Sequence, residues 1–490
     1  MTEYRQNGDY DAMLRTLQKD AGILLSSLHP KAVLAALDEC PAAVLASHPL
    51  AILVLMRSMF NWRNIPKMLE LKELLLTAIS ENTALSAQEK GDLRGECDLI
   101  MSFLCYNDIS AMSRLHRSAS AQMSRKAISI QSGGGWTFGS PSVLMMFYRA
   151  SGELQSELTE MDECMPHYYK ITNGHGQGAE TIMRAEADFM RACFADAQIM
   201  LERAYAQIGG NGQENMALCC DFLAWRLSLC TSFTPRESFE QRREALLQQH
   251  NVAWLNILQS SCAYYYALLG LPEKIPAVFR EHQLASIHFL APGKPMMELI
   301  ENQVYLAQGE YAKVIGHSEA LLGMCEAMHY ALVALHIRLQ TAAAYEMLGK
   351  RETADELLIS ALAAAEPDAL YLPFVENYRY LKTALTRGAG AKFAAFVRTV
   401  TPLGEDFVRR CGEKRAEGSR PAALAGLTER ESAIAALVAK RLSNREIAEQ
   451  LFLSEGSVKQ YINQIYSKLL ITGDVRTKRK RLAELAAPKS

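Results

Sequence analysis

Strand-like alternation of hydrophobic and polar residues is rare over most of this chain. Between residues 1 and 408, alanine, leucine, methionine and glutamate are plentiful, and proline is sparse. This pattern predicts an all-α body. A second pattern, of short segments that each begin with a capping residue, starts at Leu427.

A turn recurs at regular intervals along the body. The motif Tyr-x-x-x-Gly ends at Gly270, Gly309 and Gly349, in steps of 39 and 40 residues. Tracing the motif backwards adds weaker turns, so that the expected series is Asn64, Asn107, Gly152, Cys193, Cys230, Gly270, Gly309 and Gly349. Steps of this length predict helix pairs stacked into an α-solenoid similar to tetratricopeptide repeats, though longer than their usual ~34 residues. A non-repetitive helical bundle with coincidental glycine turns is the alternative.

The C-terminal segment has the pattern of a helix-turn-helix. An amphipathic helix carrying Ile434 is followed by Ser443, which can cap a short second helix. Ser454 can cap a longer third helix that runs through Lys468.

The third helix has two distinct faces. Its apolar residues share one stripe at helical spacing: Val458, Ile462, Ile465 and Leu469. Another face carries Lys459, Gln460, Asn463 and Ser467. Lysine can donate to guanine edges, and glutamine and asparagine can pair with adenine, so this face suits the major groove. A solvated surface helix is the alternative, but the two capped helices before it favour base contact.

Four motifs in this segment closely resemble the LuxR-type (NarL/FixJ-like) DNA-binding domain: Leu427-Thr-Glu-Arg-Glu, Leu442-Ser-Asn-Arg-Glu-Ile-Ala, Val458-Lys-Gln-Tyr and Ile465-Tyr-Ser-Lys-Leu. The resemblance implies a four-helix domain on double-stranded DNA, with RNA polymerase as a further partner. It places Lys459, Gln460 and Asn463 at bases, and Ser454, Ser457 and Asn444 near phosphates. Arg445, Tyr461 and Ser467 complete the predicted DNA-binding set. Tyr461 replaces the usual histidine of the family, and Leu470 replaces a glycine that would permit a left-handed helix end.

The body resembles, more loosely, the helical-repeat region of MalT-like regulators. The similarity lies in His48-Pro-Leu-Ala, in residues 136–142 and in Ala185-Glu-Ala. In that family a nucleotide-binding module precedes the repeats, but none is recognisable here. The stretch Gly134–Pro141 has P-loop glycine spacing, yet Ser140 and Pro141 occupy the positions of the phosphate-binding lysine and the metal-binding hydroxyl. We therefore expect a loop between helices, and no cofactor.

Two loops, residues 132–142 and 173–178, interrupt the repeats. Insertions of this kind map to one face of a solenoid, often the binding face. A small-molecule or peptide ligand is therefore predicted to contact Trp136, His167, Tyr168, Asn173 and His175. The alternative is that the aromatic residues pack between helices and the glycines only connect them.

Charge separates the two parts of the chain. The 490 residues carry a net charge of -2, but the residues from Leu424 onward carry +5 and the remainder -7. A basic module on an acidic body suits phosphate binding. Residues 409–426 combine charge, glycine, serine and proline, and are predicted to form a flexible linker.

The expected location is the cytoplasm. The eleven cysteines include no C-x-x-C pair, which indicates reduced thiols. No apolar stretch approaches the ~20 residues of a membrane helix, and the N-terminus lacks an apolar signal region. We expect no membrane contact.

No catalytic or metal-binding motif is present in the sequence, so we do not expect an enzyme. The basic run Arg476-Thr-Lys-Arg-Lys-Arg481 falls on the fourth helix, which often forms the dimer contact in LuxR-type domains. Its five cations would repel a symmetry mate, so a homodimer through this helix is in doubt. The run either contacts phosphates or is solvated.

These observations predict a cytoplasmic, sequence-specific DNA-binding transcriptional regulator. Its expected parts are a helical-repeat sensor or interaction domain (1–408), the linker (409–426) and a LuxR-type reader (427–490). Ligand or partner binding in the body would change self-association and hence DNA binding. The alternatives are a sigma-factor region, or a protein-protein interaction scaffold with a vestigial DNA-binding domain.

Overall fold

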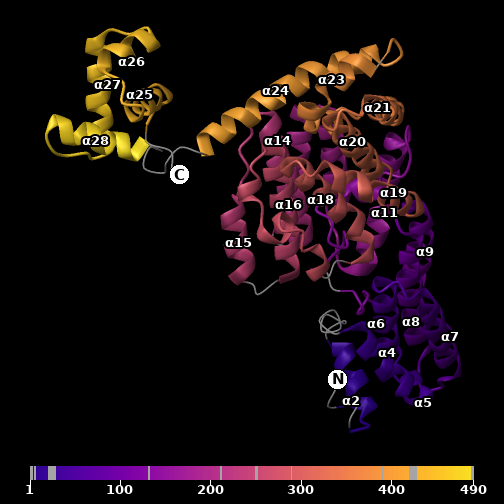
Figure 1. Cartoon of the computed structure of the whole chain (residues 1–490). Helices are drawn as coiled ribbons and strands as arrows, with labels where there is room; N and C mark the ends of the chain where they lie inside the picture. Colours follow the sequence, from indigo (N-terminus) through magenta and orange to yellow (C-terminus); the bar gives the residue numbers. More distant parts are fainter. Residues whose placement is uncertain are drawn as a thin grey trace. The chain divides into compact units, whose positions relative to one another are not determined.

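The computed structural model describes residue 4 and residues 7–19, 29–130, 133–209, 212–248, 252–287, 290–388, 390–418 and 427–486. The chain divides into two compact units, Met1–Val408, hereafter the body, and Arg409–Ser490, the C-terminal unit. All regular structure within the described residues is helical, which confirms the all-α fold class (Figure 1). None of the described helices has the length and apolarity needed to cross a membrane.

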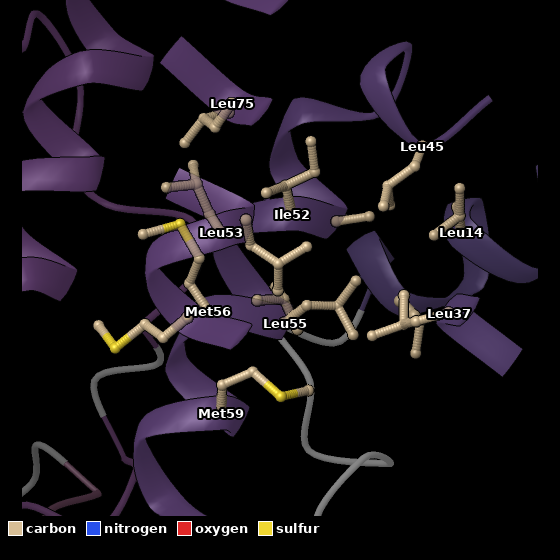
Figure 2. Close-up of a cluster of buried hydrophobic side chains, with 14 of the residues drawn as sticks. Leu14, Leu37, Leu45, Ile52, Leu53, Leu55, Met56, Met59 and Leu75 are labelled. Carbon is tan, nitrogen blue, oxygen red and sulfur yellow. The ribbon is translucent and has the colours of Figure 1, made fainter. Parts of the chain in front are cut away.

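The first part of the body is organised around one buried helix. Its helices are α2 (Tyr10–Lys19), α4 (Pro30–Glu39), α5 (Ala42–Ala46), α6 (Pro49–Asn61), α7 (Ile65–Glu81), α8 (Ala87–Met101) and α9 (Ile109–Gln122). Every residue of α6 from Ala51 to Met56 is buried, as expected for a helix that is apolar on all sides. Figure 2 shows Ile52, Leu53, Leu55, Met56 and Met59 of α6 among leucines of α2, α4, α5 and α7.

The rest of the body continues as a series of helices. They are α10 (Leu144–Phe147), α11 (Leu154–Thr172), α12 (Ala179–Met190), α13 (Phe194–Ile208), α14 (Glu214–Cys230), α15 (Phe239–Gln248), α16 (Val252–Leu269), α17 (Ala277–Arg280), α18 (Lys294–Gln308), α19 (Tyr311–Ala327), α20 (Ala331–Met347), α21 (Arg351–Ala365), α22 (Leu372–Glu376), α23 (Tyr378–Gly388) and α24 (Ala394–Gly418). Short 3-10 helices are η1 (Ser102–Cys105), η2 (Pro272–Lys274), η3 (Leu284–Ser286), η4 (Ala291–Gly293) and η5 (Glu366–Asp368). Successive helices pack in pairs: α6 with α7, α8 with α9, α12 with α13, α18 with α19, and α20 with α21. This pairing has the character of a solenoid, and the likeness to tetratricopeptide repeats stays a prediction.

The predicted turn series is correct at its glycines, shifted by one residue at three other turns, and wrong at Cys230. A positive φ is found at Gly152, Gly270, Gly309 and Gly349. At the non-glycine turns the left-handed residue precedes the predicted one, and is Arg63, Tyr106 or Ala192. Asn64 instead caps α7, because its side-chain oxygen accepts a hydrogen bond from the Lys67 N–H (3.3 Å). Cys230 is simply the last residue of α14.

Contacts between distant helices distinguish the body from an open solenoid, in which each repeat contacts only its neighbours. Helix α10 packs against α20, and α12 against α22. The Ala331 N–H donates to the Tyr148 carbonyl (3.1 Å), and the Tyr371 N–H donates to the Met190 carbonyl (2.9 Å). Early and late helix pairs of the body are therefore joined directly.

The predicted flexible linker over residues 409–426 is wrong in its first part. Helix α24 continues to Gly418, and the boundary between the two units falls within it. The apolar stripe of this helix continues through buried Cys411, at helical spacing after Phe396, Val400 and Phe407. An ion pair one turn apart, Arg409–Glu413 (2.5 Å), lies on the same segment. Residues 419–426 lie outside the described residues.

Candidate functional site

The C-terminal unit presents the predicted helical pattern over residues 429–486. Its helices after α24 are α25 (Glu429–Ala439), α26 (Asn444–Leu451), α27 (Glu455–Lys468) and α28 (Val475–Ala486). They enclose a core whose buried side chains include Ile434, Val438, Ile447, Val458, Ile462, Ile465 and Leu482. The predicted apolar stripe of α27 therefore faces this core, with Leu469 half-buried at its end.

Side-chain caps fix where the first three helices of this group begin. Thr428 and Glu431 form a reciprocal capping box at α25, and Ser443 and Glu446 form another at α26. At α27 the Ser454 Oγ accepts a hydrogen bond from the Ser457 N–H (3.0 Å). These caps satisfy N–H groups that an uncapped helix would leave unpaired, so the sequence sets the helix starts locally.

An ion pair between an exposed lysine and a buried glutamate connects the end of α27 to the start of α25. The Lys468 Nζ lies 2.7 Å from an oxygen of Glu431, whose side chain is buried. Burial acts to raise the pKa of Glu431, but hydrogen bonds from Lys468 and Thr428 outweigh it and lower that pKa. Lys468 therefore fixes the end of α27 against the start of α25, since its ammonium group is engaged within the domain.

The polar face of α27 is exposed. Lys459, Gln460, Asn463 and Ser467 all have exposed side chains. Gln464, which was absent from the predicted set, is exposed as well. The signal for it was available, because Gln464 lies one helical turn after Gln460.

The remaining predicted DNA-binding residues divide into exposed and partly buried ones. Ser454 and Arg445 are exposed, and Arg445 pairs with Glu449 across one turn (3.2 Å). Ser457 is half-buried, and its Oγ lies 2.8 Å from the Ser454 Oγ. Tyr461 is half-buried and packs against the hydrophobic core of the domain, so its ring also has a structural role.

The basic run of α28 is partly used within the domain. Arg479 donates from Nη1 to the Asn444 Oδ1 (2.7 Å) and from Nη2 to the Leu442 carbonyl (2.5 Å). Arg481 donates to the Thr472 carbonyl (3.3 Å). Because the oxygen of Asn444 accepts from Arg479, the amide N–H groups are left as its donors, and a phosphate requires donors.

Two residues in this unit adopt a left-handed backbone with exposed side chains. Phe452 ends α26 with φ 52° and is 95% exposed, and Leu470 follows α27 with φ 54° and is 85% exposed. A left-handed conformation is strained for a residue with a Cβ. Leu470 therefore occupies the left-handed position that a glycine would take without strain.

Comparison with known proteins identifies this unit. Residues 425–479 match the family model GerE, described as bacterial regulatory proteins, luxR family. The C-terminal unit carries a LuxR-family helix-turn-helix domain. Over 63 residues the chain is 41% identical to the transcriptional regulatory protein LnrK of Bacillus subtilis (strain 168), a match that covers 12% of this chain and 29% of LnrK. The predicted resemblance of the C-terminal motifs to the LuxR type is confirmed, whereas that of the body to MalT-like regulators stays a prediction.

The body contains a separate cavity of about 240 Å³. Its walls are mainly aromatic: Trp62, Phe103, Tyr106, Trp136, Phe138, Phe147 and Tyr168. Polar side chains also reach it, from Arg57, Ser58, Asn61, His116 and His175. Helices α6, α9 and α11 and the two predicted loops therefore meet around one space.

Three of the five predicted ligand residues line this cavity, namely Trp136, Tyr168 and His175. His167 and Asn173 are not among its lining residues, so the geometry does not support the predicted ligand contact for these two. Asn173 is exposed and ends α11 in the left-handed conformation. Arg57 and His116 were missed, because they lie on helices α6 and α9, far from the two loops in the sequence and without a motif that points to a site.

The first loop is held by α14 and lies against the second loop. The Asn215 Oδ1 accepts hydrogen bonds from the backbone N–H groups of Trp136 (2.7 Å) and Thr137 (2.8 Å). A Cβ placed on Gly176 would lie 2.3 Å from the Trp136 Cδ1. The indole thus rests directly on the backbone of Gly176, where only glycine leaves room for it.

Burial keeps the titratable groups of the cavity neutral. It lowers the pKa of His175 to about 4 and that of His116 to about 3, and it raises the pKa of Tyr168. Arg57, whose Nη1 donates to the Ser129 carbonyl, is therefore the charged group among the described lining residues. The cavity combines aromatic walls with a single positive charge.

Proposed function

We propose that this protein is a DNA-binding transcriptional regulator that places α27 in the major groove. The observation that carries the proposal is the exposed polar face of Lys459, Gln460 and Asn463 on the third helix of a LuxR-family domain. These side chains have the donor and acceptor groups that read guanine and adenine edges. LnrK is a transcriptional regulatory protein, and the similarity of its segment supports the same role here.

Phosphate contacts would orient the domain on the duplex. Arg445 and Ser454 are exposed, and the amide donors of Asn444 face away from the oxygen that Arg479 occupies. Contacts of this kind fix the register of a protein on DNA but carry no sequence information. Arg476 and Lys480 of α28 would add a salt-dependent attraction to the polyanion.

In the same proposal, the body senses a ligand or partner and changes self-association of the chain. Paired readers on two half-sites would bind more tightly than one, because the second contact becomes intramolecular. A homodimer and contact with RNA polymerase belong to this proposal. The cavity between α6, α9 and α11 supports a small-molecule signal.

The test is selection of sites from genomic DNA fragments by the full chain, followed by affinity measurements on the enriched site. The Lys459→Ala/Asn463→Ala double variant should lose at least about tenfold in affinity for that site, since each base contact contributes about 1–3 kcal/mol of discrimination. Arg445→Ala should instead weaken binding equally on all sequences and reduce the dependence on salt. Lys31→Ala, which removes one charge from an exposed position of the body, is the control and should change neither.

Failure to enrich any site, or enrichment unchanged in the double variant, would contradict a sequence-specific reader. In that case the protein would be an interaction scaffold with a basic C-terminal domain.

A further inference from the structure

We propose that the cavity in the body binds a small aromatic carboxylate of one or two rings. Its ring would lie against Trp136 and Phe147, and its carboxylate would face Arg57 and His175. This inference deepens the proposed function and rests on it only for the assumption that the body responds to a ligand.

The volume selects a small molecule. An enclosed apolar space of about 150 Å³ is enough to hold benzene. The 240 Å³ available here therefore accommodates one ring with a short substituent, or two fused rings. Drug-sized ligands and peptides occupy spaces from about 300 Å³ upward, so a peptide is disfavoured.

The walls of the cavity favour a ligand with a flat, apolar ring. The rings of Trp136 and Phe147 lie 4.9 Å apart, centroid to centroid, and together they form one corner of the cavity. Phe138, from the loop, packs 5.7 Å from Phe60 of α6 and adds a second aromatic wall. Aromatic surfaces of this kind pack best against another ring, by offset or edge-to-face contact.

One ring nitrogen of His175 in the cavity makes no hydrogen bond of normal geometry. The Tyr168 hydroxyl lies 2.6 Å from the His175 Nδ1, and Nε2 of the same ring is buried without a hydrogen bond of normal geometry among the described residues, although the Gly134 backbone acts to raise the pKa of the ring. In the tautomer in which the phenol donates to Nδ1, the hydrogen of the neutral imidazole is on Nε2. A buried unpaired donor is unfavourable, and a ligand oxygen would satisfy it.

Charge selects an anion over a cation or a neutral amide. Arg57, Tyr168 and His175 line the same cavity, and the guanidinium of Arg57 acts to lower the pKa of the other two groups. No carboxylate of the chain is among the described lining residues. A ligand carboxylate would therefore meet a cation and a neutral donor together, and charge-assisted hydrogen bonds are the stronger kind.

The experiment is calorimetric titration of the full chain with matched probes: benzoate and indole-3-carboxylate, their neutral amides, and benzylamine. At least one carboxylate should bind saturably and at least about tenfold more tightly than its amide, because the amide lacks the charge-assisted contact. Benzylamine should not bind. This comparison needs no variant, so it does not depend on whether a substitution is tolerated.

Variants locate the binding. Arg57→Leu should reduce carboxylate affinity at least about tenfold, and Arg57→Lys should recover part of the loss, since it keeps the charge but loses the planar fork. Arg114→Leu, which removes an exposed arginine from α9, is the matched control and should bind as the unchanged protein does. Equal affinity for carboxylate and amide, no saturable binding of either carboxylate, or unchanged binding by a folded Arg57→Leu protein would each overturn the inference.

DNA binding of the ligand-free chain is measured in parallel. Site selection that succeeds while the titrations fail refutes only the ligand class. Saturable carboxylate binding by a chain that selects no DNA site refutes the proposed function and leaves the cavity assignment standing.

Discussion

At the scale of single residues, the backbone conformation predicts which substitution should stabilise the LuxR-family domain. The turn after α27 requires a left-handed residue, and this chain places Leu470 there with φ 54°. The side chain is 85% exposed, so it gains little from packing. The strain of a left-handed Cβ residue, about 1–2 kcal/mol, is therefore not offset by burial.

We expect Leu470→Gly to stabilise the domain by roughly 1 kcal/mol, because glycine relieves the strain but has greater freedom in the unfolded chain. All four tryptophans belong to the body, so fluorescence does not report on this domain. The stability of this domain is measured instead by hydrogen exchange of peptides from α27, followed by mass spectrometry. Leu470→Ala is the matched control: it removes the same side chain but keeps the strain. Equal protection in the two variants would show that φ is not the cause.

At the scale of one element, α24 shows how a charged sequence can still be a packed helix. Its last part is rich in arginine and glutamate, yet Cys411 is buried and continues the stripe of Phe396, Val400 and Phe407. Cys411 thus extends the apolar stripe of the helix beyond its apolar part. A linker was predicted from the composition of this segment, which does not take into account the helical spacing of Cys411 with the apolar residues before it.

Thiol labelling distinguishes a packed helix from a linker. Cys193 is exposed whereas Cys411 is buried, so a maleimide should modify Cys193 rapidly and Cys411 only when α24 opens. Peptide mass spectrometry at short labelling times measures both sites in the same protein, with Cys193 as the internal control. Modification of Cys411 at the rate of Cys193 would indicate that this part of α24 is open in solution.

At the scale of the whole body, a buried ion pair helps to join helices that are far apart in the chain. Arg226 of α14 lies 2.8 Å from Glu376 of α22, and both side chains are 1% exposed. The Tyr148 hydroxyl donates to Asp368 (2.6 Å), which connects the end of α10 to η5, before α22. Because these groups are removed from water, each depends on its partner.

Breaking the Arg226–Glu376 pair should destabilise the body more than removing both members. Arg226→Met alone should cost about 3–5 kcal/mol, because Glu376 is left buried without its counter-ion. The Arg226→Met/Glu376→Leu double variant should lose less. Urea unfolding followed by tryptophan fluorescence reports on the body, where all four tryptophans lie. A double variant whose loss equals or exceeds the sum of the two single losses would show that the charges do not depend on one another.

Local patterns in the sequence determined the helical fold class and most of the helix starts in the LuxR-family domain. Caps at Ser443 and Ser454 and the apolar stripe of α27 depend only on residues within a few positions of each other, so they can be identified without the fold. The same holds for the left-handed glycines of the repeat turns. The shift at Asn64 has a local reason too, since asparagine serves there as a helix cap.

Only the tertiary structure decided which distant residues meet. The cavity brings together Arg57, Trp136 and His175 from segments with no shared local pattern. It leaves out His167 and Asn173, which the sequence analysis had grouped with Trp136 and His175. The same is true of the contact between Arg479 and Asn444, and of the closure of α14 onto α22. Helix periodicity fixes which face of an element is buried, but it does not specify the partner of that face. Packing between whole elements makes that choice.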